Sequence, residues 1–200
     1  GGDYDLAGFC VGIADLGDIV DGSGIIPGDV VLGLASSGVH SNGYTLVRKL
    51  FEASGASADD IFPGTNRSFR EGLLEPTIIY TRILEKLLQN TRAKGMVHVT
   101  GGGFYDNIPR VLPQNVCARI DFGVWDMPPV FEWLKEQGRL SWPEMLQIFN
   151  CGIGYIVIVD GAEAENVLKR AHVLNSRAWK IGEITARKEQ DKEQVDILFG

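Results

Sequence analysis

Short apolar runs alternate along this chain with segments whose apolar residues recur at the helical period. The runs are rich in β-branched residues and have the length of buried strands. They predict strands at residues 6–13, 30–35, 96–100, 116–121, 153–160 and 178–187, and an edge strand at 193–199. The helical period predicts helices at residues 43–54, 76–90, 107–112, 129–137, 142–149 and 162–174.

Local signals define several connections between these elements. Pro76 stands where the helix over residues 76–90 would begin, a position at which a missing N–H costs nothing. Ser141 and Glu144 have the spacing of a capping box. Residues 56–71 are polar and predict a long surface loop. Because strands and helices alternate without strict βαβ units, we expect an α+β fold, a layered α/β domain with a mixed β-sheet packed by helices.

Composition narrows the classes of protein to which the chain can belong. Its 200 residues, 44% of them apolar, suit one good-sized domain. The formal net charge is −7 and no block of Lys or Arg occurs, so no nucleic-acid partner is expected. Backbone N–H groups could still bind an anionic small molecule. The longest apolar run, residues 155–159, is too short to span a bilayer, so no membrane association is expected.

The cysteines indicate the cellular compartment, and the first residues indicate how the chain relates to a longer protein. Cys10, Cys117 and Cys151 are far apart and stand beside apolar residues, which fits buried reduced thiols in a cytoplasmic protein. The chain begins without Met and runs directly into a strand-like pattern, so we expect it to begin within a longer protein. Residues 1–25 are then the end of an N-terminal domain or a linking strand, and residues 26–200 a C-terminal α/β domain.

Three segments place small or polar residues between an apolar run and a helix or turn. In the first, "SSGVHSNGY", Ser41 or Asn42 is expected to cap the following helix. Gly38 and Gly43 would let the backbone approach a ligand, and the helix N-terminus favours an anion. His40 could add a hydrogen bond or a proton near neutral pH. The alternative is helix capping alone, with His40 pointing into solvent.

The second segment is "TGGGFYDN". Gly101, Gly102 and Gly103 follow a strand directly, and three successive glycines lower chain stability without adding packing. We therefore expect a backbone cradle, with Thr100 and Asn107 as side-chain donors. The spacing matches neither a Walker A loop nor GxGxxG. A tight turn that needs positive φ explains the glycines equally well.

The third segment is "FNCGIGY", and the simplest interpretation of it is structural. Asn150 is expected to cap a helix C-terminus, and Cys151 to be a packed thiol rather than a nucleophile. His98 is expected to be a satisfied strand histidine, and His172 to lie on the surface. Three carboxylates lie near glycine-rich segments, without a spacing that assigns a metal site: Asp3, Asp5 and Asp106.

These segments occur in a distinctive order. "DYDLAGFCVG", "SSGVHSNGYTLVRKL", "PTIIYTRIL", "HVTGGGFYDNIPRVLP", "FEWLKEQG", "MLQIFNCGIGY" and "AWKIGEI" follow one another over almost all of the chain. Together they closely resemble the C-terminal part of phosphoribosylformylglycinamidine cyclo-ligase, also called aminoimidazole ribonucleotide synthetase. A single GGG would be weak support for this resemblance, whereas the ordered set is specific.

The resemblance implies an enzyme of de novo purine biosynthesis that uses ATP and Mg²⁺. In that family ATP phosphorylates the formyl amide oxygen of formylglycinamidine ribonucleotide, and the imidazole ring closes with release of phosphate. The family forms homodimers through an N-terminal half that also provides much of the ATP site. That half is absent from this sequence, so the isolated chain is expected to have little or no activity.

Transferred onto this sequence, the resemblance implies two sets of site residues. The catalytic residues would be His40 and Asn42. The substrate- and phosphate-binding residues would be Ser36, Ser37, Gly38, Ser41, Gly43, Thr100, Gly101, Gly102, Gly103 and Asn107. No residue of this chain is assigned as a metal ligand.

Two alternatives remain open. Selenophosphate synthetase, thiamine-monophosphate kinase and the amidotransferase of the preceding purine step share the two-domain plan, although the HSNGY and NIPRVLP motifs fit the cyclo-ligase better. A non-catalytic interaction domain could also reuse the fold. The glycine-rich segments argue against that alternative, because a scaffold gains nothing from three successive glycines.

Overall fold

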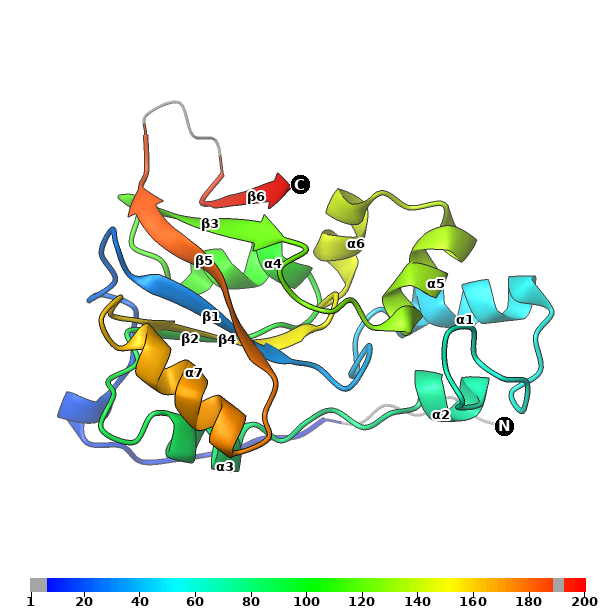
Figure 1. The fold of residues 1–200 in the computed structure, drawn as a ribbon, viewed down its shortest axis with the longest axis horizontal. Helices are drawn as coiled ribbons and strands as arrows, with labels where there is room; N and C mark the ends of the chain where they lie inside the picture. The colour runs from blue at the N-terminus through cyan, green and yellow to red at the C-terminus, as the bar shows by residue number, and fades with distance from the viewer. Residues whose placement is uncertain (1–6, 189–192) are drawn as a thin grey trace.

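The computed structural model describes residues 7–188 and 193–200, within which six strands form one mixed sheet (Figure 1). The strands are β1 (Val30–Ala35), β2 (Gly95–His98), β3 (Val116–Phe122), β4 (Ile153–Val159), β5 (Ala178–Ala186) and β6 (Val195–Phe199). Their order is β2-β4-β1-β5-β3-β6, and neighbouring strands are antiparallel except for the parallel pair β3 and β6. The expected α+β fold with a mixed sheet is confirmed.

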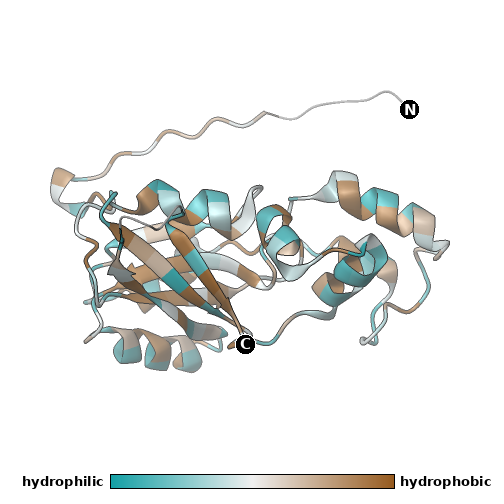
Figure 2. Cartoon of the chain, turned by 90° about the horizontal axis from the view of Figure 1, so that it is seen from above, coloured by the Kyte–Doolittle hydropathy of each residue, from teal (hydrophilic) through white to brown (hydrophobic). Residues whose placement is uncertain are grey.

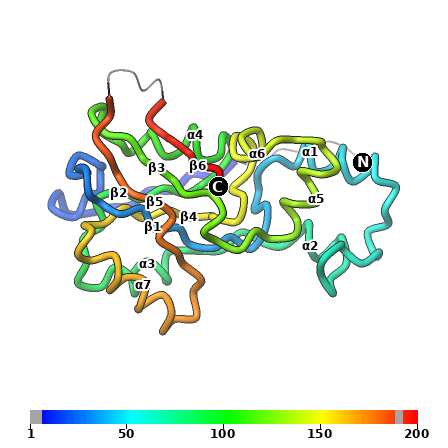
Figure 3. The backbone as a smooth tube through the Cα atoms, turned by 45° about the horizontal axis from the view of Figure 1, so that its top comes forward, coloured from blue at the N-terminus to red at the C-terminus, as the bar shows by residue number. Residues whose placement is uncertain are grey.

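Helices cover both faces of the sheet. They are α1 (Tyr44–Ser54), α2 (Phe69–Leu73), α3 (Thr81–Leu87), α4 (Gly103–Asn107), α5 (Pro129–Gly138), α6 (Trp142–Ile148) and α7 (Ala164–Val173), with 3₁₀ turns at Leu16–Asp18 and Ile108–Val111. Figures 1 and 3 show α3 and α7 on one face and α4 on the other. In both views α1, α2 and α5 lie beyond one end of the sheet.

The sheet separates two apolar cores, which explains why its central strands are uninterrupted apolar runs. Alternate residues of β4 enter different cores. Ile156 and Ile158 join the core that contains Phe104 of α4, and Val157 and Val159 join the core beneath α3 and α7. Figure 2 shows apolar residues concentrated on the strands, whereas the helices carry both kinds.

The strand expected at residues 6–13 is wrong for the described part, residues 7–13. These residues form no regular structure, and the side chains of Phe9, Val11 and Ile13 are almost fully exposed. The alternating pattern is that of a strand, but a strand forms only when a neighbour accepts its backbone hydrogen bonds. Cys10 lies in the same segment and is exposed, so the expectation that it is buried is wrong.

The helix expected over residues 76–90 is shorter, and Pro76 does not begin it. Helix α3 starts at Thr81, and residues 75–80 are irregular. Tertiary hydrogen bonds hold this segment: Ser37 Oγ donates to the Pro76 carbonyl oxygen at 2.7 Å, and Tyr80 Oη donates to the Ala35 carbonyl oxygen at 2.7 Å. These partners are distant in sequence, so the helical period could not reveal them.

The surface loop expected at residues 56–71 is partly wrong. Phe62 and Phe69 are buried and pack against the ring of Trp133. Ser68 and Glu71 form a capping box that begins α2. The capping box expected at Ser141 and Glu144 is confirmed at the start of α6. Within residues 7–188 and 193–200, no helix has the length and apolar character to cross a bilayer.

Candidate functional site

Three loops meet at the end of the sheet beside α1. The first loop (residues 36–43) follows β1, the second (residues 99–103) follows β2, and the third (residues 150–152) precedes β4. Because β4 is antiparallel to both β1 and β2, the start of β4 lies beside the ends of its two neighbours. The fold thus brings together the three segments that share one sequence pattern.

Asn42 joins the first loop to the second. Its Oδ1 accepts a hydrogen bond from the Gly101 N–H at 3.0 Å. The expectation that Ser41 or Asn42 caps α1 is therefore wrong: the N-cap is Gly43, at φ 73°, and no side chain caps the helix. A Cβ on Gly43 would lie 2.2 Å from the Phe149 ring, so contact with that ring also requires glycine here.

Asn150 joins the first loop to the third. This residue is 1% exposed, and its Nδ2 donates to the Gly38 carbonyl oxygen at 2.9 Å. Its Oδ1 accepts from the Gly152 N–H at 2.9 Å, and the Gly152 carbonyl oxygen accepts from the Ser36 N–H at 2.8 Å. The helix-capping prediction for Asn150 is wrong, because Phe149 is the C-cap of α6.

Asn107 organises the second loop from within. Its Nδ2 donates to the Gly103 carbonyl oxygen at 2.7 Å and to the Gly101 carbonyl oxygen at 3.2 Å. Its Oδ1 accepts from Thr100 Oγ1 at 3.1 Å. The polar groups of Thr100 and Asn107 are thus engaged with each other and with the loop backbone.

The glycine run has structural reasons at two of its three positions. Gly102 has φ 89° and is the N-cap of α4. Gly103 has φ 56°, and a Cβ on it would lie 1.9 Å from the Leu146 carbonyl oxygen of α6. Gly101 is exposed, and its N–H is bound to Asn42. The tight-turn alternative therefore explains Gly102 and Gly103.

His40 lies inside the first loop rather than in solvent. It is 3% exposed, at φ 56°, and its Nε2 accepts from the Ser37 N–H at 3.2 Å. This bond assigns the proton to Nδ1, which has no partner within the described residues. Burial, with a smaller contribution from His98, lowers the pKa of His40 to about 4. His40 is therefore a neutral imidazole at physiological pH, with an unused N–H donor.

His40 belongs to an aromatic cluster with Tyr80, His98 and Tyr155. The His40 ring centroid lies 6.2 Å from that of Tyr80 and 6.3 Å from that of His98. Gly154 of β4 makes room for this cluster, because a Cβ there would lie 2.5 Å from His40 Cε1 and 2.2 Å from Tyr80 Oη. Burial raises the pKa of Tyr80 far above its usual value.

The remaining predicted residues differ in exposure and in hydrogen-bond partners. Ser41 Oγ lies 3.1 Å from Thr77 Oγ1, and Ser36 Oγ is buried without a partner within the described residues. His172 is exposed, as expected. His98 ends strand β2, but it is exposed and, in the part of the chain that is described, not held by hydrogen bonds as expected. Sequence reasoning did not identify three residues of this site, because nothing in their spacing links them to His40: Tyr80, Gly154 and Tyr155.

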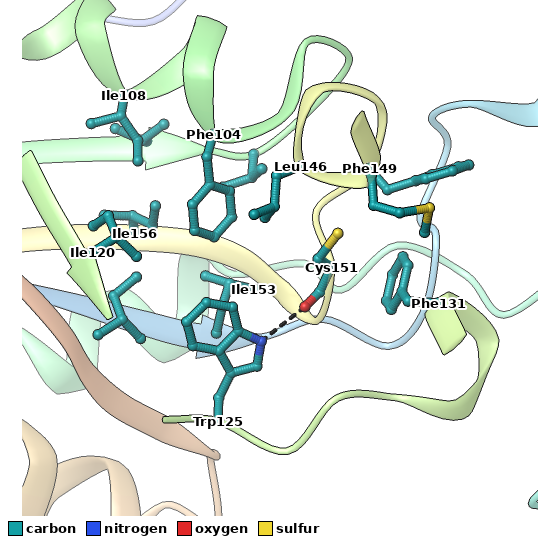
Figure 4. Close-up of a cluster of buried hydrophobic side chains, with 14 of the residues drawn as sticks. Phe104, Ile108, Ile120, Trp125, Phe131, Leu146, Phe149, Cys151, Ile153 and Ile156 are labelled. Carbon is teal, nitrogen blue, oxygen red and sulfur yellow. Dashed lines mark hydrogen bonds between the residues drawn. The ribbon is translucent and has the colours of Figure 1, made fainter. Parts of the chain in front are cut away.

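Cys151 is a packed thiol, as expected. It is fully buried, and burial raises the pKa of its thiol far above the usual range. Its carbonyl oxygen accepts from Trp125 Nε1 at 2.9 Å, within a cluster that includes Phe131 and Phe149 (Figure 4). A neutral thiol in apolar surroundings is not a nucleophile.

Carboxylates contribute little to the loops. Asp106 is exposed on α4, and Asp3 and Asp5 lie outside the described residues. In the part of the chain that the structure describes, no group of three or more His, Cys, Asp or Glu side chains could hold a metal ion. What the loops offer is backbone N–H groups, hydroxyls and imidazoles, which suit an anionic ligand.

Curated relatives match the whole chain. It is 64% identical over 199 residues to a phosphoribosylformylglycinamidine cyclo-ligase of Oleidesulfovibrio alaskensis, covering 100% of this chain and 57% of that protein. It is 57% identical over 198 residues to the protein of the same name in Nitratidesulfovibrio vulgaris, covering 99% and 57%. The chain thus spans little more than half the length of these relatives. The expected resemblance is confirmed.

Solved structures with low identity share the fold. Thiamine-monophosphate kinase from Stenotrophomonas maltophilia superposes with a TM-score of 0.60 at 18% identity, over 90% of this chain and 53% of that chain. The hydrogenase maturation protein HypE of E. coli superposes with a TM-score of 0.57 at 20% identity, over 88% and 48%. The family model described as "AIR synthase related protein, C-terminal domain" matches residues 27–193. With this match, the chain belongs to the family of AIR synthase related proteins, through their C-terminal domain.

Proposed function

We propose that this chain is the C-terminal part of a phosphoribosylformylglycinamidine cyclo-ligase, the enzyme that converts formylglycinamidine ribonucleotide and ATP into aminoimidazole ribonucleotide, ADP and phosphate. The observation that carries this proposal is the 64% identity to a protein of that name over 199 residues. The meeting of three glycine-rich loops at one end of the sheet supports it. Such loops suit a reaction that depends on positioning and charge stabilisation.

We assign phosphate contacts to the groups of the loops that have no other role. Helix α1 begins at Tyr44, and its N-cap, Gly43, provides no side-chain cap, so the first N–H groups and the positive end of the helix dipole favour an anion. Ser41 is exposed beside this helix start. His40 Nδ1 and Ser36 Oγ have no partner in the described residues, and a ligand that binds them would relieve the free-energy penalty of burying them unpaired.

The other predicted residues act by positioning these groups. Asn42 holds the backbone of Gly101 against the first loop. Ser37 orients His40 through its backbone N–H and binds the Pro76 carbonyl oxygen through its hydroxyl. The site therefore includes residues that contact the ligand and residues that keep the three loops together.

The loops have groups that suit the phosphates of ATP but few ligands for Mg²⁺. When bound, ATP would supply the phosphoryl group that converts the formyl oxygen of the substrate into a leaving group. The backbone N–H groups at the start of α1 fit its phosphates, and one solved HypE structure that shares this fold is a complex with ATP. Asp106 is the one carboxylate in residues 36–43, 99–107 and 150–152. We therefore propose that Mg²⁺ is held by ATP phosphates and by groups outside this chain.

The domain organisation and the assembly follow from the same proposal. We propose a C-terminal α/β domain at 26–200, preceded at 1–25 by the end of an N-terminal domain or a linking strand, and the start of the family match at residue 27 supports this division. A homodimer would form through the N-terminal half of the longer enzyme. An enzyme of purine biosynthesis with these reduced thiols would act in the cytoplasm.

A chimaeric enzyme tests the proposal. This chain replaces the matching 57% of the Oleidesulfovibrio alaskensis protein, and the purified chimaera is assayed with formylglycinamidine ribonucleotide and ATP. We expect aminoimidazole ribonucleotide, ADP and phosphate in equal amounts, and little or no product from the 200-residue chain alone. A folded, dimeric chimaera that forms no aminoimidazole ribonucleotide would contradict the proposal. Phosphorylation of thiamine monophosphate instead would favour the kinase alternative.

A further inference from the structure

The two histidines of the aromatic cluster have opposite surroundings. His98 is the last residue of β2 and is paired in register with Tyr155 of β4. Its ring stacks on the Tyr155 ring, with centroids 6.0 Å apart and planes 24° apart, and meets the Tyr80 ring at 6.1 Å. These contacts orient His98 while leaving it exposed, whereas His40, 6.3 Å away, is buried.

The ring nitrogens of the two residues also differ in their partners. His40 uses Nε2 as an acceptor for Ser37 N–H and carries its proton on Nδ1. His98 has no hydrogen bond to either ring nitrogen within the described residues. The groups facing it from the first loop, from the residue before α3 and from β4 are His40, Tyr80 and Tyr155, all uncharged near neutral pH. Among residues 7–188 and 193–200, no carboxylate pairs with His98 to favour its charged form.

We propose that His98 is the contact of this site that takes up a proton when the phosphate group of a ligand binds, and that His40 beside it remains a neutral hydrogen-bond donor. The proposal rests on the proposed function, because it requires the three loops to bind a phosphate-bearing ligand. Partial burial lowers the pKa of His98 in the free chain. A phosphate anion at hydrogen-bonding distance favours the charged imidazole, so a proton from solvent adds to the free ring nitrogen as the ligand binds.

The burial of His40 gives it a different role. Because protonation would place an unpaired charge inside the loop, its imidazole stays neutral and offers only the Nδ1 proton. Of the two histidines, His98 is thus the one that can become protonated when the ligand binds.

Imidazole NMR of the 200-residue chain tests this division. The ¹⁵N and ¹³C resonances of His40, His98 and His172 are assigned with H40Q, H98Q and H172Q and followed from about pH 4.5 to about pH 8.5. Sulfate is the first probe because it stays doubly ionised over this range. The exposed His172 of α7 is the internal control.

We expect sulfate to raise the pKa of His98 by about one, and its affinity to be about tenfold higher when His98 is protonated than when it is neutral. His40 should keep its proton on Nδ1 down to about pH 5, and the resonances of His172 should not respond to sulfate. A His98 resonance that does not respond to any probe overturns the proposal, as does a His40 that titrates near its ordinary pKa and follows the ligand. The titrations use the unsubstituted chain, and H40Q and H172Q assign His98 by elimination because the chain has three histidines, so a poorly folded H98Q does not affect the result.

Two further probes distinguish the source of the phosphate. A response to ribose 5-phosphate but not to ATP places the phosphate of the nucleotide substrate at His98, and the reverse places ATP there. The outcome is also independent of the chimaera. An inactive chimaera together with a His98 that responds to ribose 5-phosphate would reject the proposed reaction and keep the phosphate contact. An active chimaera with an unresponsive His98 would reject the further inference alone.

Discussion

Asn150 connects the third loop to the first, and replacing it with Ala measures how strongly the loops depend on that connection. Asn150→Ala removes the donor to the Gly38 carbonyl oxygen and the acceptor for the Gly152 N–H, both buried. A buried backbone group left without a partner costs about 1–3 kcal/mol, so two such groups cost about 2–6 kcal/mol. A water molecule in the vacated space could restore part of this, and we expect a loss of about 3 kcal/mol in the free energy of unfolding.

The assay is urea unfolding with a parallel thermal melt of the chain. For a domain of this size, a loss of about 3 kcal/mol lowers the melting temperature by about 6–12 °C. Asn166→Ala is the matched control, since Asn166 is exposed on α7 and Ala has the higher helix propensity. Asn150→Ala should also speed hydrogen exchange at the Gly152 amide, because its acceptor is lost.

The reasoning is refuted if Asn150→Ala and Asn166→Ala unfold at the same denaturant concentration. In that case the carboxamide would not hold the loops together, and their meeting would depend on strand register alone. If Asn150→Ala is destabilised as expected but the Gly152 amide exchanges at the original rate, the loss of stability arises elsewhere in the fold.

Three further predictions concern the ion pair, the buried histidine and the contact between loops. Lys94→Met removes the ion-pair partner of Asp29, which is 2% exposed and lies 2.5 Å from Lys94 Nζ, and should lower the free energy of unfolding by about 3 kcal/mol in urea. Lys169→Met on the surface should change the free energy of unfolding by less than about 0.5 kcal/mol. The pKa of His40 falls from 6.5 to about 4 on folding, so its contribution to the free energy of unfolding is present above pH 6.5 and is lost as the pH falls toward 4. His40→Gln should therefore remove up to about 3 kcal/mol of the pH dependence of the free energy of unfolding. Asn42→Ala in the chimaera should lower kcat/KM at least tenfold, because Gly101 loses its anchor, with a loss of stability of only about 1 kcal/mol in a thermal melt.

Each of these has an outcome that contradicts it. Equal effects of Lys94→Met and Lys169→Met would show that the buried pair contributes no more than a surface pair. A pH dependence of unfolding that is unchanged in His40→Gln would mean that another group titrates. A chimaera that is unfolded by Asn42→Ala would make Asn42 a structural residue and not a positioning residue of the site.

The sequence predicted the elements that depend on local pattern. The apolar run at residues 30–35 and the capping box at Ser141 and Glu144 carry their own signals, so both were found where expected. The pattern failed where tertiary contacts overrode it: the segment around Pro76 is held irregular by Ser37, and residues 7–13 have strand periodicity without a neighbouring strand. No propensity contains the identity of a distant hydrogen-bond partner.

For the site, the amino-acid sequence alone determined the family, the three glycine-rich segments and the presence of His40 and Asn42 within them. Only the tertiary structure decided what those residues do. Antiparallel pairing of β4 with β1 and β2 brought the segments together, and it turned Asn42 from an expected helix cap into a bond between loops. Burial keeps His40 neutral, whereas His98 is exposed. The charge of an imidazole depends on what surrounds it in space and not on its neighbours in the chain.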